Sequence, residues 1–336
     1  MKRVLGALVA GACLLPVNAA AAEPVTLKLA TLAPDGSSWS VILKEMAERW
    51  KTASGGRVLL RVYPGGVAGD EPDVVRKIRG GTLQAGLLTA VGLAEIDPSV
   101  HAMSVPLMYA GDDEANAVLD RLRPRLESAF ESRGFVVLGW TDAGWVRFFT
   151  RTPAPTPDDL RRMKLFTWAG DPRVADVWRS AGFDAVPLPP TGILDALRTG
   201  RIDAVGSSPQ VAVIARYHDH APCMTDLPWQ LVLGATVVDK AAWERVPADV
   251  RPALADAAAE AGRQLRLAVR EGAARDVDAM KKRGLEVVAV PPAARALWQR
   301  LAQRLHSSLR GGIVPAAAFD EALAHRDEYR KRMAGR

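Results

Sequence analysis

The chain has 336 residues, with 44 Lys and Arg against 38 Asp and Glu, so its formal net charge is +6 at pH 7. These charges are spread along the sequence, and no basic cluster carries interleaved aromatic residues, so a nucleic-acid partner is not expected. The length is sufficient for two domains by the usual size range.

The first 22 residues have the pattern of a secretory signal peptide. A basic start is followed by an apolar run from Val4 to Val17 and by a small-residue tail with an A-x-A site, which predicts cleavage after Ala22. The apolar run is too short for a membrane span, and no basic stop-transfer flank follows it. Lipidation at Cys13 is the alternative, but Ala-Gly-Ala precedes this cysteine in place of a Leu-led box. The pattern predicts export to the periplasm.

Cleavage at this site has two consequences for the mature chain. It removes Lys2 and Arg3, which lowers the formal charge to +4, and it leaves about 314 residues. Cys223 is then the only cysteine, so the exported protein must fold without an intrachain disulfide.

Strand and helix signals alternate from the start of the mature chain. The pattern predicts a strand over 25–29, and apolar residues then recur at helical spacing from Trp39 to Trp50. A second strand over 58–63 is followed by a helix over 73–79. A third strand covers 86–89. This repetition predicts an α/β fold with largely parallel sheets covered by helices.

Two further segments bear on the architecture. The same pattern occurs twice, in IRGGTLQA (78–85) and LRTGRIDA (197–204). In each, a helix ends, the chain turns on a glycine (Gly81 or Gly200), and an apolar strand begins. The repetition predicts one such unit in each of two lobes. The span 247–283 contains hardly a helix breaker and would reach about 55 Å as a helix. A helix of that length is expected to cross both lobes, with a cleft between them.

The stretch KLFTWAGDP (164–172) predicts a strand that runs into a helix. Phe166 and Trp168 point to the same face of this strand, while Asp171 and Pro172 occupy the N-cap and first positions of the helix. Side chains at such a strand end lie where open α/β sheets bind ligands. Phe166 and Trp168 are therefore candidate cleft residues, and ordinary core packing is the alternative.

The chain resembles the extracytoplasmic solute-binding proteins of TRAP transporters, the DctP-like family, from about Val25 to Glu328. The motifs that carry the resemblance, in chain order, are LAPDGSSW, YPGG with GDE, IRGGTLQAG, VRFFT, PTPDDLRRMKL, VPLPPTGILDALRTGRIDAV and WERVPADVRPALADAA. The resemblance implies a two-lobed periplasmic binding protein fold, type II-like, with hinge strands and a long helix spanning both lobes. It implies lobe I over 23–145 plus 231–272, and lobe II over 146–230 plus 273–336.

This resemblance also assigns site positions. Most members of the family have an arginine that clamps a ligand carboxylate where this chain has Phe166, and Phe cannot compensate a buried anion. Arg147 in VRFFT is the candidate for a second family arginine, although the alignment there can slip by one residue. Ser208 in Ser-Ser-Pro stands where the family often has a ligand-binding asparagine. The pattern resembles the subgroup with apolar clefts, some of which work with a TPR-repeat partner protein.

Further candidates follow from strand ends or family position. They are Trp39 as a possible lid of the cleft, Tyr109, Trp229, and Asp171 as an N-cap at the cleft. For Arg147 the alternative is a structural salt bridge. Asp35, Asp70 and Glu71 lie in Gly-rich turns and rank low, because loop acids are usually solvated.

Metal binding and catalysis have little support in the sequence. His218, His220, Cys223 and Asp226 are metal-ligand types within nine residues, but the segment reads as a helix end and a loop, where H-x-H does not share a face. Hydrolase, zinc-protease and phosphate-loop motifs are absent, so neither an enzyme nor a cofactor is expected.

The sequence therefore predicts a receptor that closes over an apolar or amphipathic small molecule and delivers it to TRAP membrane subunits. Two alternatives stay open: an organic-acid receptor that uses Arg147 alone, and an occupancy sensor that reports to another exported protein.

Overall fold

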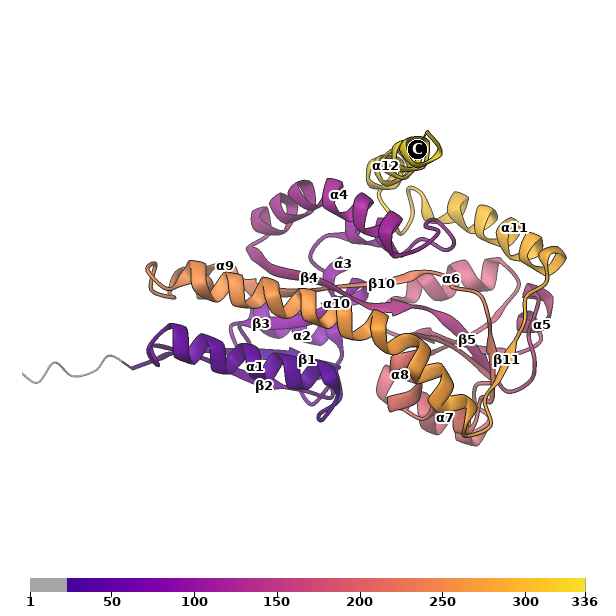
Figure 1. Cartoon of the computed structure of the whole chain (residues 1–336), viewed down its shortest axis with the longest axis horizontal. Coiled ribbons are helices and arrows are strands. Elements are labelled where there is room, and N and C mark those ends of the chain that lie inside the picture. Colours follow the sequence, from indigo (N-terminus) through magenta and orange to yellow (C-terminus); the bar gives the residue numbers. More distant parts are fainter. Residues whose placement is uncertain (1–22, 336) are drawn as a thin grey trace, which may run out of the picture.

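The computed structural model describes residues 23–335, so the predicted signal peptide lies outside the described residues. Within this range the strands form two sheets, each the base of one lobe (Figure 1). The five-stranded sheet of the first lobe has the order β2 (Val58–Tyr63), β1 (Val25–Thr31), β3 (Ala85–Thr89), β10 (Leu231–Asp239), β4 (Phe135–Trp145). The six-stranded sheet of the second lobe has the order β11 (Glu286–Val288), β9 (Cys223–Thr225), β5 (Arg147–Thr150), β8 (Ala204–Ser207), β6 (Lys164–Trp168), β7 (Asp184–Leu188).

Helices cover both sheets. Those of the first lobe are α1 (Ser38–Ala53), α2 (Glu71–Arg79), α3 (Ala90–Ala94), the 3₁₀ helix η1 (Pro98–Ser104), α4 (Asp112–Ser132) and α9 (Lys240–Glu244). Those of the second lobe are α5 (Pro157–Arg161), α6 (Pro172–Ser180), α7 (Ile193–Thr199), α8 (Pro209–Ile214) and α11 (Pro292–Leu309), with short 3₁₀ turns at Pro190–Gly192 and Tyr217–Asp219. None of the helices in residues 23–335 is long and apolar enough to span a membrane.

The α/β prediction is confirmed, but the sheets are mixed rather than largely parallel. Strand β10 runs antiparallel to both of its neighbours, β3 and β4, and β5 runs antiparallel to β8 and β9. The repeated helix–glycine–strand unit is present once in each lobe: α2 leads through Gly81 to β3, and α7 leads through Gly200 to β8. Both glycines have a positive φ, 75° and 70°, which favours glycine at the end of a helix.

The lobes are connected at three crossings, the first of which contains two adjacent passages of the chain. The chain passes from β4 to β5 through Val146, and it returns beside this crossing through Trp229 and Gln230 to β10; the Val146 amide donates to the Gln230 carbonyl oxygen at 2.8 Å. Helix α10 (Arg251–Lys281) is the second crossing and passes from the first lobe to the second in Figure 1. Its residues Leu254 and Ala258 join the first lobe's core, and Met280 joins the second's. The predicted long helix is confirmed, although it begins at Arg251 rather than near residue 247.

Helix α10 approaches β4 very closely, and two glycines make this possible. A Cβ atom on Gly262 of the helix would lie 2.7 Å from the Trp140 carbonyl oxygen, and one on Gly139 of the strand 2.7 Å from that of Ala258. Gly262 is therefore retained inside a helix despite its low helix propensity, because only hydrogen fits between the two backbones.

Helix α12 (Ala316–Ala334) makes the third crossing, because it follows α11 of the second lobe but packs beside α4 of the first (Figure 1). Its residues Ala318, Phe319 and Ala322 are buried in the core cluster that includes Leu126 and Phe130 of α4. The last part of the predicted lobe II, which extends to residue 336, thus lies against the first lobe.

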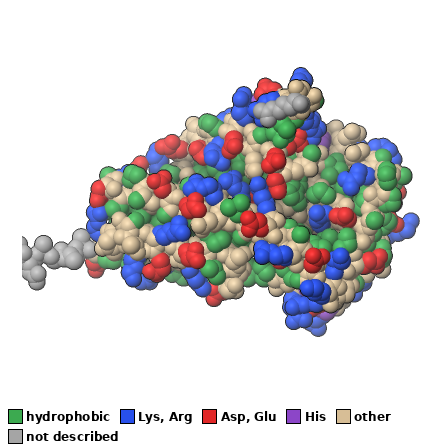
Figure 2. Space-filling view, viewed as in Figure 1, with side chains coloured by type: hydrophobic (Ala, Val, Ile, Leu, Met, Phe, Trp, Pro, Cys, Tyr) green, Lys and Arg blue, Asp and Glu red, His purple; other side chains and the backbone are tan. Residues whose placement is uncertain are grey.

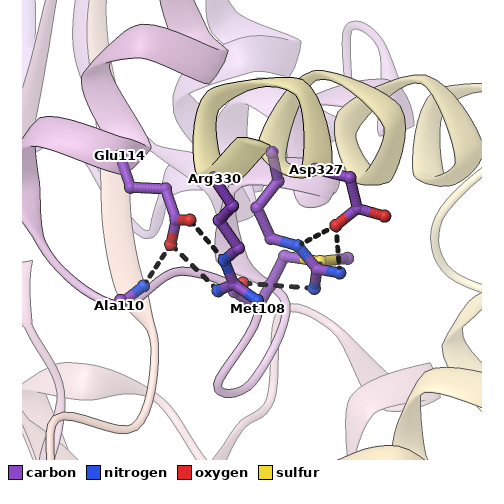
Figure 3. Close-up of polar contacts among 6 residues, drawn as sticks. Met108, Ala110, Glu114, Asp327 and Arg330 are labelled. Atoms are coloured by element: carbon purple, nitrogen blue, oxygen red, sulfur yellow. Dashed lines mark hydrogen bonds and ion pairs between the residues drawn. The ribbon is translucent and has the colours of Figure 1, made fainter. Parts of the chain in front are cut away.

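An ion pair between the buried Glu114 carboxylate and the half-exposed Arg330 guanidinium holds α12 in place (Figure 3). Glu114 is 4% exposed and accepts from Arg330 Nε at 2.6 Å and Nη2 at 3.1 Å, and from the Ala110 amide at 2.5 Å. Arg330 and Arg326 also donate to the Met108 carbonyl oxygen, at 3.3 and 3.4 Å. Glu114 lies in the first turn of α4, where the helix dipole favours a negative charge, and its ion pair with Arg330 links this end of α4 to α12.

We expect Arg330→Ala to lower the free energy of unfolding by about 1–3 kcal/mol, because the buried Glu114 carboxylate loses its charged partner. Chemical denaturation monitored by circular dichroism measures the change. Lys331→Ala on the adjacent, exposed position is the matched control. An Arg330→Ala variant as stable as the control would contradict a role of this pair in holding α12.

Candidate ligand-binding site

A cavity of about 450 Å³ lies between the two lobes. The first lobe contributes strand-end and loop residues that include Ala33, Trp39, Leu87, Thr89 and Thr141. The second lobe and the crossing contribute Val146, Phe166, Trp168, Val205, Ser208 and Val211. The walls are mainly apolar, which suits a ligand that gains binding energy from removal of apolar surface from water.

Strand β6 positions the two aromatic residues that the sequence singles out. Its burial alternates, with Leu165 and Thr167 buried on one face and Phe166 and Trp168 half-buried on the other. Phe166 and Trp168 both line the cavity, together with Trp39 and Ser208. Four of the eight predicted site residues are thus brought together at one cavity.

Direct hydrogen bonds link the two lobes beside the cavity. Trp168 Nε1 donates to Asp70 Oδ2 at 2.8 Å, and Asp70 Oδ1 accepts from the Glu71 amide at the start of α2. On the other side, Gln210 Nε2 of α8 donates to Ser38 Oγ of α1 at 2.9 Å. Asp70, expected to be a solvated rim residue, is instead the partner of Trp168.

Arg147 does not line this cavity, which corrects the prediction that it meets a polar ligand group. Adjacent residues of a strand point to opposite faces, and it is Val146 that faces the cavity. Arg147 faces a neighbouring groove of about 500 Å³ against α10, which shares Ser208 with the cavity, and its Nη1 donates there to Asp226 Oδ1 at 2.8 Å. The structural salt bridge is the correct alternative, and the cation needed for an organic-acid receptor based on Arg147 lies outside the cavity.

The other three predicted residues occupy two different environments. Tyr109 is 4% exposed in the first lobe's core, and its hydroxyl donates to the Ala102 carbonyl oxygen at 2.7 Å, so its assignment to the cleft is wrong. Trp229 and Asp171 line a second, smaller chamber. Asp171 occupies the N-cap position of α6 without a capping hydrogen bond; its Oδ1 accepts from Arg173 Nε at 3.1 Å.

The charges at the cavity are acidic. Among the described residues, no Lys or Arg lines either the cavity or the smaller chamber, whereas Glu71, Asp142 and Asp171 do. Arg270, on α10, pairs with Asp142 at 3.3 Å but lines the neighbouring groove. Burial raises the pKa of Asp142 above its ordinary value, against the opposing effect of Arg270. The cavity therefore offers no free cation to an anionic ligand.

Glu71 is the most unusual of these acids and was ranked low from the sequence. It is 1% exposed, and its carboxylate accepts from the Thr89 amide at 2.9 Å, the Thr89 hydroxyl at 2.8 Å and the Gly92 amide at 2.9 Å. Burial outweighs these hydrogen bonds and raises its pKa from 4.5 to about 7. In the sequence, the only sign of a special role for Glu71 was its place in the first turn of a helix, directly after Asp70. Its burial depends on β3 and α3, which no local pattern around Glu71 indicates.

The candidate metal ligands do not come together. Within residues 23–335 no group of three or more His, Cys, Asp and Glu is arranged to hold a metal ion. His218 is buried at 3% exposure with its Nε2 3.4 Å from Asp219, and Asp226 pairs with Arg147.

The comparisons with known proteins agree with this architecture. Residues 29–310 match the family model described as bacterial extracellular solute-binding protein, family 7. The chain is 24% identical over 283 residues to the 2,3-diketo-L-gulonate-binding periplasmic protein YiaO of Escherichia coli, covering 83% of this chain and 85% of the relative. It is 26% identical over 338 residues to the C4-dicarboxylate-binding periplasmic protein DctP of Rhodobacter capsulatus, covering 96% and 99%.

Solved structures share the fold at low identity. The sugar acid binding protein DctPAm of Advenella mimigardefordensis, in complex with galactonate, superposes with a TM-score of 0.84 at 17% identity, covering 91% of this chain and 99% of that one. A TRAP solute-binding protein of Chromohalobacter salexigens with bound D-glucuronate gives 0.82 at 20% identity, covering 90% and 99%. The match to the family model over residues 29–310 shows that the chain belongs to family 7 of the bacterial extracellular solute-binding proteins, the TRAP-type solute receptors.

Proposed function

We propose that this receptor binds an uncharged, largely apolar small molecule in the periplasm and delivers it to TRAP membrane subunits. The observation that supports the ligand class is the absence of Lys and Arg from the described residues that line the cavity. A carboxylate bound there would lose hydration without gaining a cation, at a cost of several kcal/mol.

The relatives named above bind carboxylates, so the ligand class is argued from this chain's own cavity. Phe166 stands where the family resemblance expects a clamp arginine, and Val146 takes the cavity-facing position beside Arg147. An aromatic ring and a branched aliphatic side chain provide contact area in place of charge. On this proposal the receptor shares its fold and transport role with the family but differs in the chemistry of its ligand.

A titration with matched probes tests the proposed ligand class. The mature protein is purified after unfolding and refolding, which removes any endogenous ligand, and is titrated by calorimetry with 1-decanol, decanoate, D-glucuronate and succinate. We expect 1-decanol to bind at least about tenfold more tightly than decanoate, since the two differ mainly in charge, and we expect no binding of the two hydrophilic acids. Tighter binding of any of the three acids than of 1-decanol would contradict the proposal.

Closure is expected to depend on the Trp168 indole. Trp168→Phe removes the hydrogen bond to Asp70 across the lobes, so the affinity for 1-decanol should fall about three- to tenfold. Trp298→Phe is the matched control, because its Nε1 donates to the Pro155 carbonyl oxygen at 2.9 Å inside the second lobe and it lines neither cavity. Equal affinities of the Trp168→Phe variant and the wild type would contradict a role for this contact in ligand retention.

A further inference from the structure

The segment directly after η1 is anchored in the cores of both lobes. Val105 and Met108, which are 1% and 0% exposed, are buried in the first lobe's core. The side chain of Leu107 between them packs instead against the second lobe's core, a cluster that includes Phe148 and Trp298. One side chain of the first lobe is thus inserted among the apolar residues of the second.

Leu107 reaches that core in a strained backbone conformation. Its φ is 48°, and Arg216 is the only other non-glycine residue with a positive φ in the part of the chain that the structure describes. The left-handed region is unfavourable for a residue with a Cβ atom, because this atom approaches the following carbonyl oxygen. Such a conformation persists only where the surrounding contacts hold it, so the contacts of Leu107 indicate what the strain supports.

The backbone of Leu107 is hydrogen-bonded to the first crossing between the lobes. Its amide donates to the Trp229 carbonyl oxygen at 2.7 Å. The Trp229 amide in turn donates to the Val146 carbonyl oxygen at 2.8 Å, and Val146 lines the main cavity. Two successive hydrogen bonds therefore connect Leu107 to the cavity wall, at the place where the two passages of the crossing lie side by side.

The residues on either side of Leu107 are held by two helices near the end of the chain. The Pro106 carbonyl oxygen lies 2.6 Å from His306 Nε2 of α11, and this nitrogen donates because a carbonyl oxygen can only accept. The Met108 carbonyl oxygen accepts from Arg330 of α12 (Figure 3). Contacts with the second lobe and with two of the three crossings therefore meet in three successive residues.

We propose that Leu107 is a positioning residue that serves as a fixed pivot for the movement of the lobes. Its amide is bonded to the crossing itself, so this contact can persist while the lobes open and close. Its side chain keeps the second lobe's core in place relative to the first, and the strained backbone is what lets it reach across. This inference goes beyond the proposed function, since it concerns the movement of the lobes and not the class of ligand.

Distances between the lobes of the ligand-free, refolded mature protein test this assignment. Charged side chains cover both lobes on the face shown in Figure 2, so exposed charged positions can carry labels. Lys51→Cys in α1 and Arg198→Cys in α7, both at exposed positions, receive spin labels, and the buried Cys223 is replaced by serine in every sample. Double electron–electron resonance then gives the distribution of the distance between the two labels.

We expect Leu107→Ala to broaden this distribution, because the second lobe loses the side chain that fixes it against the first. Leu323→Ala is the matched control: it deletes the same atoms from a partly buried leucine, but Leu323 packs against the first lobe's core. The control should lower the melting temperature without broadening the distribution. His306→Phe, a milder second variant, keeps a ring but removes the donor to Pro106, and it should also broaden the distribution.

Leu107→Gly tests the strain separately. Glycine adopts a positive φ without a Cβ atom, so Leu107→Gly should melt no lower than Leu107→Ala, although glycine usually lowers stability relative to alanine. A clearly lower melting temperature would contradict the strained conformation that the pivot requires. Distributions as narrow as that of the wild type in folded Leu107→Ala and His306→Phe would overturn the inference and leave Leu107 an ordinary packing residue. Either result leaves the proposed ligand class unaffected, because no ligand is present.

Discussion

Replacing Phe166 by arginine is expected to reduce the affinity for 1-decanol by at least about 100-fold. Phe166 lines the main cavity, so a guanidinium there lies against the apolar body of the ligand. Loss of the aromatic contact and burial of a charge against an uncharged ligand each oppose binding, and burial of an unpaired charge alone costs several kcal/mol. Since a hundredfold change corresponds to about 2.7 kcal/mol, the expected loss is within this range.

The same substitution should improve the binding of acids. Arginine provides a planar, permanently charged fork that matches a carboxylate, so decanoate is expected to bind Phe166→Arg more tightly than the wild type. Calorimetric titration of both probes measures the two effects. Phe166→Leu, which keeps an apolar side chain, is the control and should retain most of the affinity for 1-decanol. Unchanged binding of 1-decanol by Phe166→Arg would show that Phe166 does not contact the ligand.

The second large effect concerns Glu71 and the pH dependence of stability. The native protein holds the Glu71 proton up to about pH 7, because burial raises the pKa, whereas the unfolded chain releases it near pH 4.5. Between these values the native state binds more protons than the unfolded state, so stability falls as pH rises. The shift predicts a loss of about 3 kcal/mol across this window, at 1.36 kcal/mol per pKa unit.

Glu71→Gln isolates this contribution, because the amide does not titrate and keeps one acceptor oxygen, which can serve the Thr89 hydroxyl and the Gly92 amide. We expect the free energy of unfolding of the wild type, relative to this variant, to decline from pH 4.5 to pH 7. Urea denaturation at each pH measures this difference, with the exposed Glu48→Gln variant as control. A difference that stays constant or grows with rising pH would contradict the burial of a protonated Glu71.

The local geometry that the sequence predicted correctly depends on periodicity. Phe166 and Trp168 reach one face because strand side chains alternate, and Gly81 and Gly200 end their helices because both adopt a left-handed conformation. Arg147 shows the limit of this reasoning. A shift of one residue along a strand turns a side chain to the opposite face, and the sequence did not fix that register.

The remaining features depend on contacts between residues far apart in the chain. Trp168 and Asp70 are separated by 98 residues, and Glu114 and Arg330 by 216, so no local pattern could indicate either pair. Burial of Glu71 and Tyr109 likewise requires neighbouring elements to be in place. The signal peptide, the domain boundaries and a TPR-repeat partner stay predictions from the sequence.

The identity of the endogenous ligand tests the central claim most directly. The mature protein would be purified natively from the periplasm and denatured, and the solvent extract analysed by mass spectrometry, with a Phe166→Arg preparation as control. We predict a stoichiometric, uncharged and largely apolar molecule, which is lost from the control. Recovery of a dicarboxylate or a sugar acid from the wild-type protein would contradict the account.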